Sequence, residues 1–153
     1  MKPVAQEERT GCGIAAVATL AGVTYQEARR AALRLGISAS DPLLWSDQSH
    51  VRRLLAQYHI HLAKNEAPFR SWEALPGVAL LAIKWHRAKG LAFWHWVVFH
   101  RGPDGPVVLD SNRSLRSHRR RDFGRLRPKW FIPLTLPRLS NSRRSAEPNP
   151  RRE

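Results

Sequence analysis

Apolar residues form one almost unbroken run near the start of the chain, at residues 12–21 (CGIAAVATLA). A run with so few polar interruptions is typical of a helix that is buried on all sides. Gly11 and Gly13 stand at its beginning, and Gly22 stands at its end, where glycine commonly terminates helices. The pattern therefore predicts a buried helix over residues 12–21.

Two further helices are predicted from apolar residues at helical spacing. In residues 24–36, Thr24 and Glu27 have the spacing of a capping box, and Gly36 supplies the end. The core face of this helix is predicted to contain Ala28, Ala32 and Leu33. A third helix is expected from about residue 46 to residue 58, with Val51, Leu54, Leu55 and Tyr58 on its apolar face.

After residue 63 the periodicity changes to that of strands. Buried strands are predicted at GVALLAIKW (77–85), AFWHWVVFHR (92–101) and PVVLDS (106–111). The residues between the last two, Gly-Pro-Asp-Gly at 102–105, have strong turn chemistry and predict a hairpin. KWFIPLTL (129–136) predicts another strand, which Pro133 restricts to a sheet edge or a bend.

Helices followed by antiparallel strands predict an α+β fold. The length of 153 residues suits one domain, expected over residues 1–137. Residues 138–153 offer almost nothing to bury and are predicted to form a disordered basic tail. No stretch is long and apolar enough to span a membrane, and the first residues do not resemble a secretory signal.

The net charge of +14 is unevenly distributed. Residues 1–112 carry 13 Lys/Arg against 9 Asp/Glu, whereas residues 113–153 carry 13 Lys/Arg against 3 Asp/Glu. The segment 113–153 is therefore a candidate for binding an anionic partner, either nucleic acid or lipid. The alternative is a solvated segment that aids solubility.

The single cysteine, Cys12, lies at the predicted start of the buried helix. One cysteine cannot form an internal disulfide, which fits a reducing compartment and a cytoplasmic location. The unsatisfied N–H groups of a helix start favour a thiolate, the form in which a thiol attacks. Gly11 and Gly13 would let the chain turn sharply and let a substrate approach closely. A small apolar residue at a helix start is the alternative interpretation.

A nucleophilic cysteine needs a base, normally a histidine that a third polar group orients. Of the seven histidines, His95 stands inside an apolar strand between two tryptophans. If Gly102 and Gly105 close the hairpin, Asn112 lies opposite His95, and Asp110 is the diagonal neighbour roughly 7–8 Å away. We prefer Asp110 as the orienting residue, with Asn112 as the alternative. Gln6, six residues before Cys12, is the candidate side-chain donor to an oxyanion.

These residues resemble the bacteriocin-processing peptidase family, papain-like cysteine peptidases that cut leader peptides after a double glycine. The resemblance rests on QEERTGCG (6–13), on HWVV (95–98) and on VLD (108–110), and covers roughly residues 4 to 135. Trp96 and Ser111 depart from the family's usual phenylalanine and proline. The resemblance implies a stand-alone member with a papain-like fold, in which Cys12 is the nucleophile, His95 the base, Asp110 the orienting residue and Gln6 the oxyanion donor.

The leading hypothesis is thus a cysteine-dependent hydrolase acting on a peptide or protein, with amidase or acyl-transferase use of the same triad left open. A non-catalytic peptide-binding module is the second hypothesis. The third is a nucleic-acid-associated protein in which residues 113–130 neutralise phosphates and Trp130 or Phe123 stacks on bases. No cofactor is expected, and one cysteine with scattered histidines shows no metal-ligand spacing.

Overall fold

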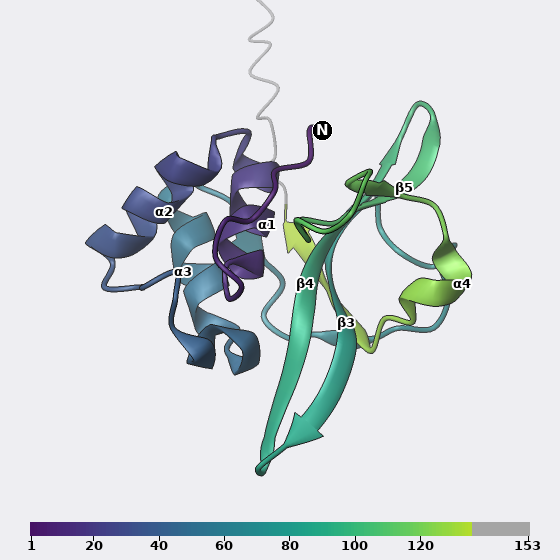
Figure 1. Ribbon diagram of the computed structural model, residues 1–153. Coiled ribbons are helices and arrows are strands. Elements are labelled where there is room, and N and C mark those ends of the chain that lie inside the picture. Colours follow the sequence, from purple (N-terminus) through teal and green to yellow (C-terminus); the bar gives the residue numbers. More distant parts are fainter. Residues whose placement is uncertain (136–153) are drawn as a thin grey trace, which may run out of the picture.

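The computed structural model describes residues 1–135, with helices first and an antiparallel sheet after them (Figure 1). The predicted α+β class is confirmed. The tail predicted at residues 138–153 lies outside the described residues. The helices are α1 (Cys12–Ala21), α2 (Tyr25–Arg34), the 3-10 helix η1 (Pro42–Ser46), α3 (Ser49–Gln57) and α4 (Phe123–Leu126). The strands are β1 (His61–Leu62), β2 (Ala67–Pro68), β3 (Val78–Ala88), β4 (Leu91–Gly102), β5 (Gly105–Leu109), β6 (Arg119–Arg120) and β7 (Trp130–Thr135).

Helix α1 occupies the range predicted for the buried helix. Eight of its ten residues are buried, and Gly22 ends it in the left-handed conformation with φ of 69°. Glycine adopts this conformation without steric cost, which is why a helix can stop there. Because α1 contacts α2, α3 and β4, it forms the centre of the helical layer.

Helix α2 begins as predicted, with the Thr24 side chain accepting a hydrogen bond from the Glu27 N–H at 3.2 Å. The prediction of a buried Leu33 is wrong, because that side chain is 59% exposed. The buried face consists of Tyr25, Ala28, Ala31 and Ala32. Residues at i, i+3 and i+4 share one helix face, and Leu33 lies one step further around the helix.

Helix α3 begins three residues later than the predicted start at residue 46. The Asp47 carboxylate accepts hydrogen bonds from the backbone N–H groups of Ser49, at 3.1 Å, and His50, at 2.9 Å. These bonds satisfy N–H groups that have no partner within the helix and so fix its beginning. Val51, Leu54 and Leu55 are fully buried, as predicted.

The strands form one sheet with the order β1-β7-β3-β4-β5-β6, and β2 pairs beside β1 on the outer side of β7. Strand β7 is therefore covered on its outer side by two short strands. Pro133 is compatible with this position because its carbonyl accepts a hydrogen bond from the Ala63 N–H at 2.9 Å, on the side away from β3. The missing N–H of the proline thus removes no bond from the ladder with β3.

Two hydrophobic clusters lie on opposite faces of the sheet. One joins α1, α2 and α3 to alternate residues of β3 and β4, including Leu80, Ala82, Trp94, Trp96 and Val98. The other packs the intervening residues against the segment around Leu75 and against α4 (Figure 1). Within residues 1–135, no helix combines the length and the apolar character that membrane crossing requires.

Candidate active site

Cys12 is the first residue of α1, and its side chain is 1% exposed. The segment before it is folded back on itself, with the Gly11 N–H donating to the Glu8 carbonyl at 3.0 Å. In the described part of the chain, the Cys12 N–H has no backbone hydrogen-bond partner. A free N–H and the positive end of the helix dipole therefore lie at the thiol.

The glycines on either side of Cys12 lie close to side chains from other parts of the chain. Gly11 has a φ of −87°, which any residue can adopt. A Cβ on Gly11 would overlap the Tyr25 hydroxyl and lie 3.1 Å from the Glu8 carbonyl oxygen. A Cβ on Gly13 would overlap Nε2 of His50 and lie 2.9 Å from Cγ2 of Val51. Both glycines thus make room for buried side chains of the protein itself.

His95 and Asp110 lie in direct contact. Nε2 of His95 donates to Oδ1 of Asp110 over 2.7 Å, and the aspartate side chain is fully buried. The predicted hairpin register is found from Gly102–Gly105 as far as Val98–Leu109. The chain then leaves the sheet, so Asp110 can approach His95 closely.

Asn112 has another function. Its backbone N–H donates to Oδ1 of Asp110 at 3.0 Å, while its side-chain oxygen accepts bonds from Ser114. The structure therefore places Asp110, and not the Asn112 side chain, against the imidazole.

Two residues that the sequence did not single out hold Asp110 in place. Arg120 on β6 donates to Oδ2 of Asp110 at 3.0 Å, and its guanidinium also pairs with Asp122. The His118 ring donates from Nδ1 to the Asp110 carbonyl at 2.8 Å. Only the pairing of β5 with β6 brings these residues beside Asp110, and no sequence motif indicates it.

The charges of the pair stabilise each other. Burial alone lowers the pKa of His95, but the hydrogen bond to Asp110, followed by the hydrogen bond and charge of Cys12, raises it to about 9. Burial alone raises the pKa of Asp110, but the contacts with His95, the Asn112 N–H and Arg120 lower it to about 2. Near neutral pH the imidazole is protonated and the carboxylate is charged.

Cys12 is near enough to His95 to contribute to the raised pKa of its imidazole. Because Nε2 of His95 is bonded to Asp110, the ring nitrogen that remains for Cys12 is Nδ1. The structure thus brings Cys12, His95 and Asp110 together from α1, from β4 and from the end of β5. This is the order of contacts that a nucleophile, a base and an orienting acid require.

Gln6 is buried and lines the same cavity as His95, but both hydrogens of its amide are in use. Nε2 donates to the carbonyls of Glu8 and Arg9 at 3.0 Å each, and Oε1 accepts from the Ser111 hydroxyl at 2.8 Å. The Gln6 N–H also donates to the Ser111 carbonyl at 3.0 Å. In this arrangement, Gln6 ties the segment before Cys12 to the segment after Asp110.

A cavity of about 300 Å³ opens beside His95. It is lined by residues 6–9 together with Trp45, His95, Asn112 and Arg113. Trp45 belongs to η1, and its indole N–H donates to the Arg9 carbonyl at 3.2 Å. Sequence reasoning missed Trp45, because η1 is brought to the site only by its packing against β4.

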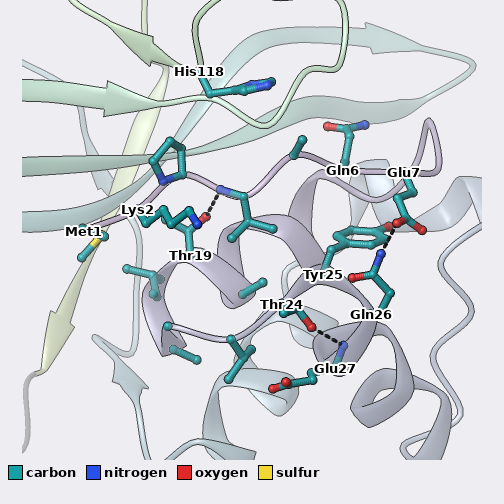
Figure 2. A pocket seen from close by; sticks show the side chains of 18 of the residues that line it. Met1, Lys2, Gln6, Glu7, Thr19, Thr24, Tyr25, Gln26, Glu27 and His118 are labelled. Atoms are coloured by element: carbon teal, nitrogen blue, oxygen red, sulfur yellow. Dashed lines mark hydrogen bonds between the residues drawn. The ribbon is translucent and has the colours of Figure 1, made fainter.

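A larger cavity of about 1060 Å³ lies next to it and shares Gln6, Glu7 and Arg113 with it. Figure 2 shows His118 on one side of this cavity and Thr24, Tyr25 and Glu27 on the other, with the N-terminal segment running along it. The two cavities are therefore neighbours, and the smaller one is the cavity that His95 lines.

Behind α1 lies a second histidine–aspartate pair. Nδ1 of the buried His50 donates to Oδ2 of Asp47 at 2.9 Å, and Nε2 faces Gly13 with no hydrogen-bond partner. Burial is the main reason that the pKa of His50 is lowered, although contacts with Asp47 act in the opposite direction. His50 is accordingly a neutral packing residue near the start of α1.

Several cationic side chains of residues 113–120 form hydrogen bonds with backbone carbonyls of the protein itself. Arg113 donates to the Glu7 carbonyl at 2.6 Å, and Arg119 donates to the Met1 carbonyl at 2.7 Å.

The expectation that Trp130 stacks on bases is wrong, because Trp130 is buried among Trp94 and Trp96 with ring centroids 5.1 and 5.3 Å away. Phe123 packs on Trp72 at a centroid distance of 4.8 Å.

Among residues 1–135, no three His, Cys, Asp or Glu side chains are grouped so that they could hold a metal ion. Comparisons with protein-family models, curated proteins and solved structures give no match for this chain. The chemistry of the site therefore has to be inferred from its geometry.

Proposed function

We propose that the protein is a cysteine-dependent hydrolase, a peptidase of papain-like architecture, with Cys12, His95 and Asp110 as its catalytic triad. The observation that carries this proposal is the position of His95. It is bonded through Nε2 to a buried aspartate, and the nearby thiol of the single cysteine raises its pKa further. A buried carboxylate on one side of the imidazole and a thiol near it form the arrangement that a catalytic histidine needs.

In the first half of the reaction, the Cys12 thiolate attacks the carbonyl carbon of the scissile amide, and a C–S bond forms. The carbonyl electrons move to oxygen, where the unpartnered Cys12 N–H stabilises the negative charge. His95 then donates the Nδ1 proton to the leaving nitrogen, the C–N bond breaks, and a thioester remains.

In the second half, neutral His95 takes a proton from water, and the resulting hydroxide attacks the thioester carbonyl. The C–S bond breaks, releasing a carboxylic acid and restoring the thiolate and the imidazolium. Asp110 stabilises the imidazolium in both halves and fixes the ring through Nε2, while Arg120 fixes Asp110.

We assign Gln6 two roles, one before substrate binds and one after. Its present bonds to the Glu8 and Arg9 carbonyls hold the loop that presents Cys12. To serve as the second oxyanion donor, Nε2 has to release one of these two bonds when substrate binds.

A polypeptide is the substrate class that the surroundings favour. Two neighbouring cavities lie along the N-terminal segment, the smaller one at His95, and together they offer more room than a small amide requires. Because Cys12 is 1% exposed and His95 is 14% exposed, the substrate approaches from the histidine side, past Trp45.

The test is labelling with a thiol-directed activity probe. Wild type should be labelled, Cys12→Ala should not, and His95→Ala should be labelled at least 100-fold more slowly. His61→Ala, an exposed histidine on β1, is the matched control and should be labelled like wild type. Labelling of Cys12 that survives the loss of His95 would contradict the triad.

A peptide-binding module without catalysis is the second candidate, and the burial of Cys12 and the occupied Gln6 amide favour it. It predicts that wild type and Cys12→Ala bind peptides equally and that neither hydrolyses them. A peptide library analysed by mass spectrometry with both proteins separates the two functions.

A further inference from the structure

Strands β3 and β4 continue beyond the sheet as a two-stranded ribbon, called the arm here, which consists of residues 84–93. Figure 1 shows it projecting away from both the helices and α4. Every residue from Lys84 to Leu91 is exposed except the half-buried Trp85. With a rise of about 3.3 Å per residue, the arm extends roughly 15 Å past Ile83, the last buried residue of β3.

The arm is positively charged, and acidic residues are absent from a long stretch around it. No Asp or Glu occurs between Glu73 and Asp104 in the sequence. Lys84, Arg87 and Lys89 are all exposed, and none takes part in an ion pair in the described part of the chain. Cations elsewhere do pair, as Arg29 does with Glu7 and Glu8. Other exposed cations, such as Arg30 and Lys64, are unpaired as well, so the arm differs in that its three cations project together with no acidic residue among them.

Both lysines of the arm occupy backbone positions that normally favour glycine or asparagine. Lys84 has a φ of 53° at the irregularity between Ile83 and His86, and Lys89 has a φ of 51° in the two-residue turn that it forms with Gly90. A long side chain in the left-handed region is unfavourable, whereas Asn-Gly is the usual choice for such a turn. Local folding does not account for a lysine at either position.

Aromatic rings lie on the arm, and one further cation, Lys129, lies at its base. His86 stacks on Phe93 across the two strands, with ring centroids 5.6 Å apart. The Lys129 ammonium lies 4.6 Å from the centre of the Trp85 ring, so the segment before β7 follows the base of the arm. No residue of the arm lines either cavity beside His95. The arm is therefore separate from the proposed catalytic site.

We propose that the arm is a nucleic-acid-binding element that enters the major groove of duplex DNA, with Lys84, Arg87 and Lys89 contacting phosphates. The major groove is about 12 Å wide and admits a two-stranded ribbon, whose strands are about 4.8 Å apart. The major groove of double-stranded RNA is too deep and narrow for side chains to read. The ribbon geometry thus selects duplex DNA among polyanions.

The experiment measures binding of a fluorescent 20-base-pair DNA by anisotropy between 50 and 200 mM salt. Replacing Lys84, Arg87 and Lys89 together by glutamine should weaken binding at least tenfold at 50 mM salt. It should also reduce the slope of log K against log salt by about 2.7, because each lost phosphate contact removes about 0.9. The matched control replaces Arg30, Arg34 and Lys64, three exposed cations elsewhere, and has the same net charge.

Equal losses in the two triple variants would overturn the proposal, because binding would then follow net charge alone. So would binding of double-stranded RNA or of polyglutamate as tightly as DNA. Cys12→Ala should bind DNA like wild type, so the outcome is independent of the proposed hydrolase. Thermal melting of both triple variants shows whether the fold is kept, which their exposed positions lead us to expect.

Discussion

Two histidine–aspartate pairs lie near the first turn of α1, His95 with Asp110 and His50 with Asp47. Both have short contacts, of 2.7 and 2.9 Å. The pKa of His95 is nevertheless raised to about 9, whereas that of His50 is lowered. The same two residue types thus give a protonated imidazole in one place and a neutral one in the other.

The difference comes from the partners of each aspartate and from the second ring nitrogen. Asp110 is fully buried, so its attraction for His95 is weakly screened, and Cys12 adds to it. The Asp47 side chain is 36% exposed, and Nε2 of His50 has no partner, so burial prevails. The environment of each pair, rather than the pairing itself, decides whether the pKa of its imidazole is raised or lowered.

The largest expected effect comes from replacing each aspartate by asparagine. Asp110→Asn should lower kcat/KM for peptide hydrolysis by about 10³–10⁴, because the amide cannot stabilise the imidazolium and its NH₂ disfavours the required tautomer. Asp47→Asn should leave kcat/KM within about threefold and lower stability by about 1 kcal/mol, because asparagine has one acceptor oxygen where Asp47 uses two, for Ser49 and for His50. Equal kinetic losses in the two variants would remove the distinction between the pairs.

Gly13→Ala should destabilise the fold by about 1–3 kcal/mol, because the added Cβ overlaps the His50 ring. The double variant Gly13→Ala/His50→Ala should recover part of this loss, since the overlap is removed. Urea unfolding of the two single variants and the double variant measures the coupling. If the free-energy losses of the two single variants add up to that of the double variant, Gly13 does not accommodate His50.

Titration followed by NMR of the imidazoles distinguishes the pairs directly. In wild type, His95 should titrate near pH 9 and His50 below 6.5. In Asp110→Asn the pKa of His95 should fall by more than about one unit, while that of His50 stays unchanged. A His95 that titrates near 6.5 in both proteins would contradict the contact with Asp110.

Stability should vary with pH in opposite directions for the two histidines. The pKa of His95 is raised above the unfolded value, so its contribution is complete below about pH 6.5 and is lost as pH rises through about 9. The pKa of His50 is lowered, so its contribution is lost as pH falls below 6.5. Asp110 contributes above its usual value of 3.8 and loses this contribution as pH falls through about 2. Melting temperatures should therefore decline between about pH 6.5 and pH 9 in wild type but much less in Asp110→Asn, and His50→Gln should reduce the decline below pH 6.5.

The smallest effect is expected for Arg120→Gln, which removes one of the contacts on Asp110. A reduction of kcat of about three- to tenfold is expected, with KM nearly unchanged, because Asp110 keeps its bonds to His95 and the Asn112 N–H. Arg120→Lys should restore part of the loss. An unchanged kcat for Arg120→Gln would show that Asp110 needs no support from β6.

The sequence by itself determined the elements whose pattern is strong and local. The apolar run predicted α1 residue for residue, and the Gly102–Gly105 turn predicted the register of β4 and β5. Together these brought Cys12, His95, Asp110 and Gln6 into consideration, because a helix start and a hairpin register are set by neighbouring residues. The position of Leu33 was missed because hydrophobicity alone does not establish which helix face is buried.

Only the tertiary structure decided what surrounds those residues. It placed Arg120 and Trp45 at the site, turned the Gln6 amide to the Glu8 and Arg9 carbonyls, and put His50 behind Gly13. It also buried Asp110 and left Asp47 partly exposed, which separates the pKa values of two similar pairs. Burial and long-range contacts depend on how distant segments pack, so no local pattern contains them.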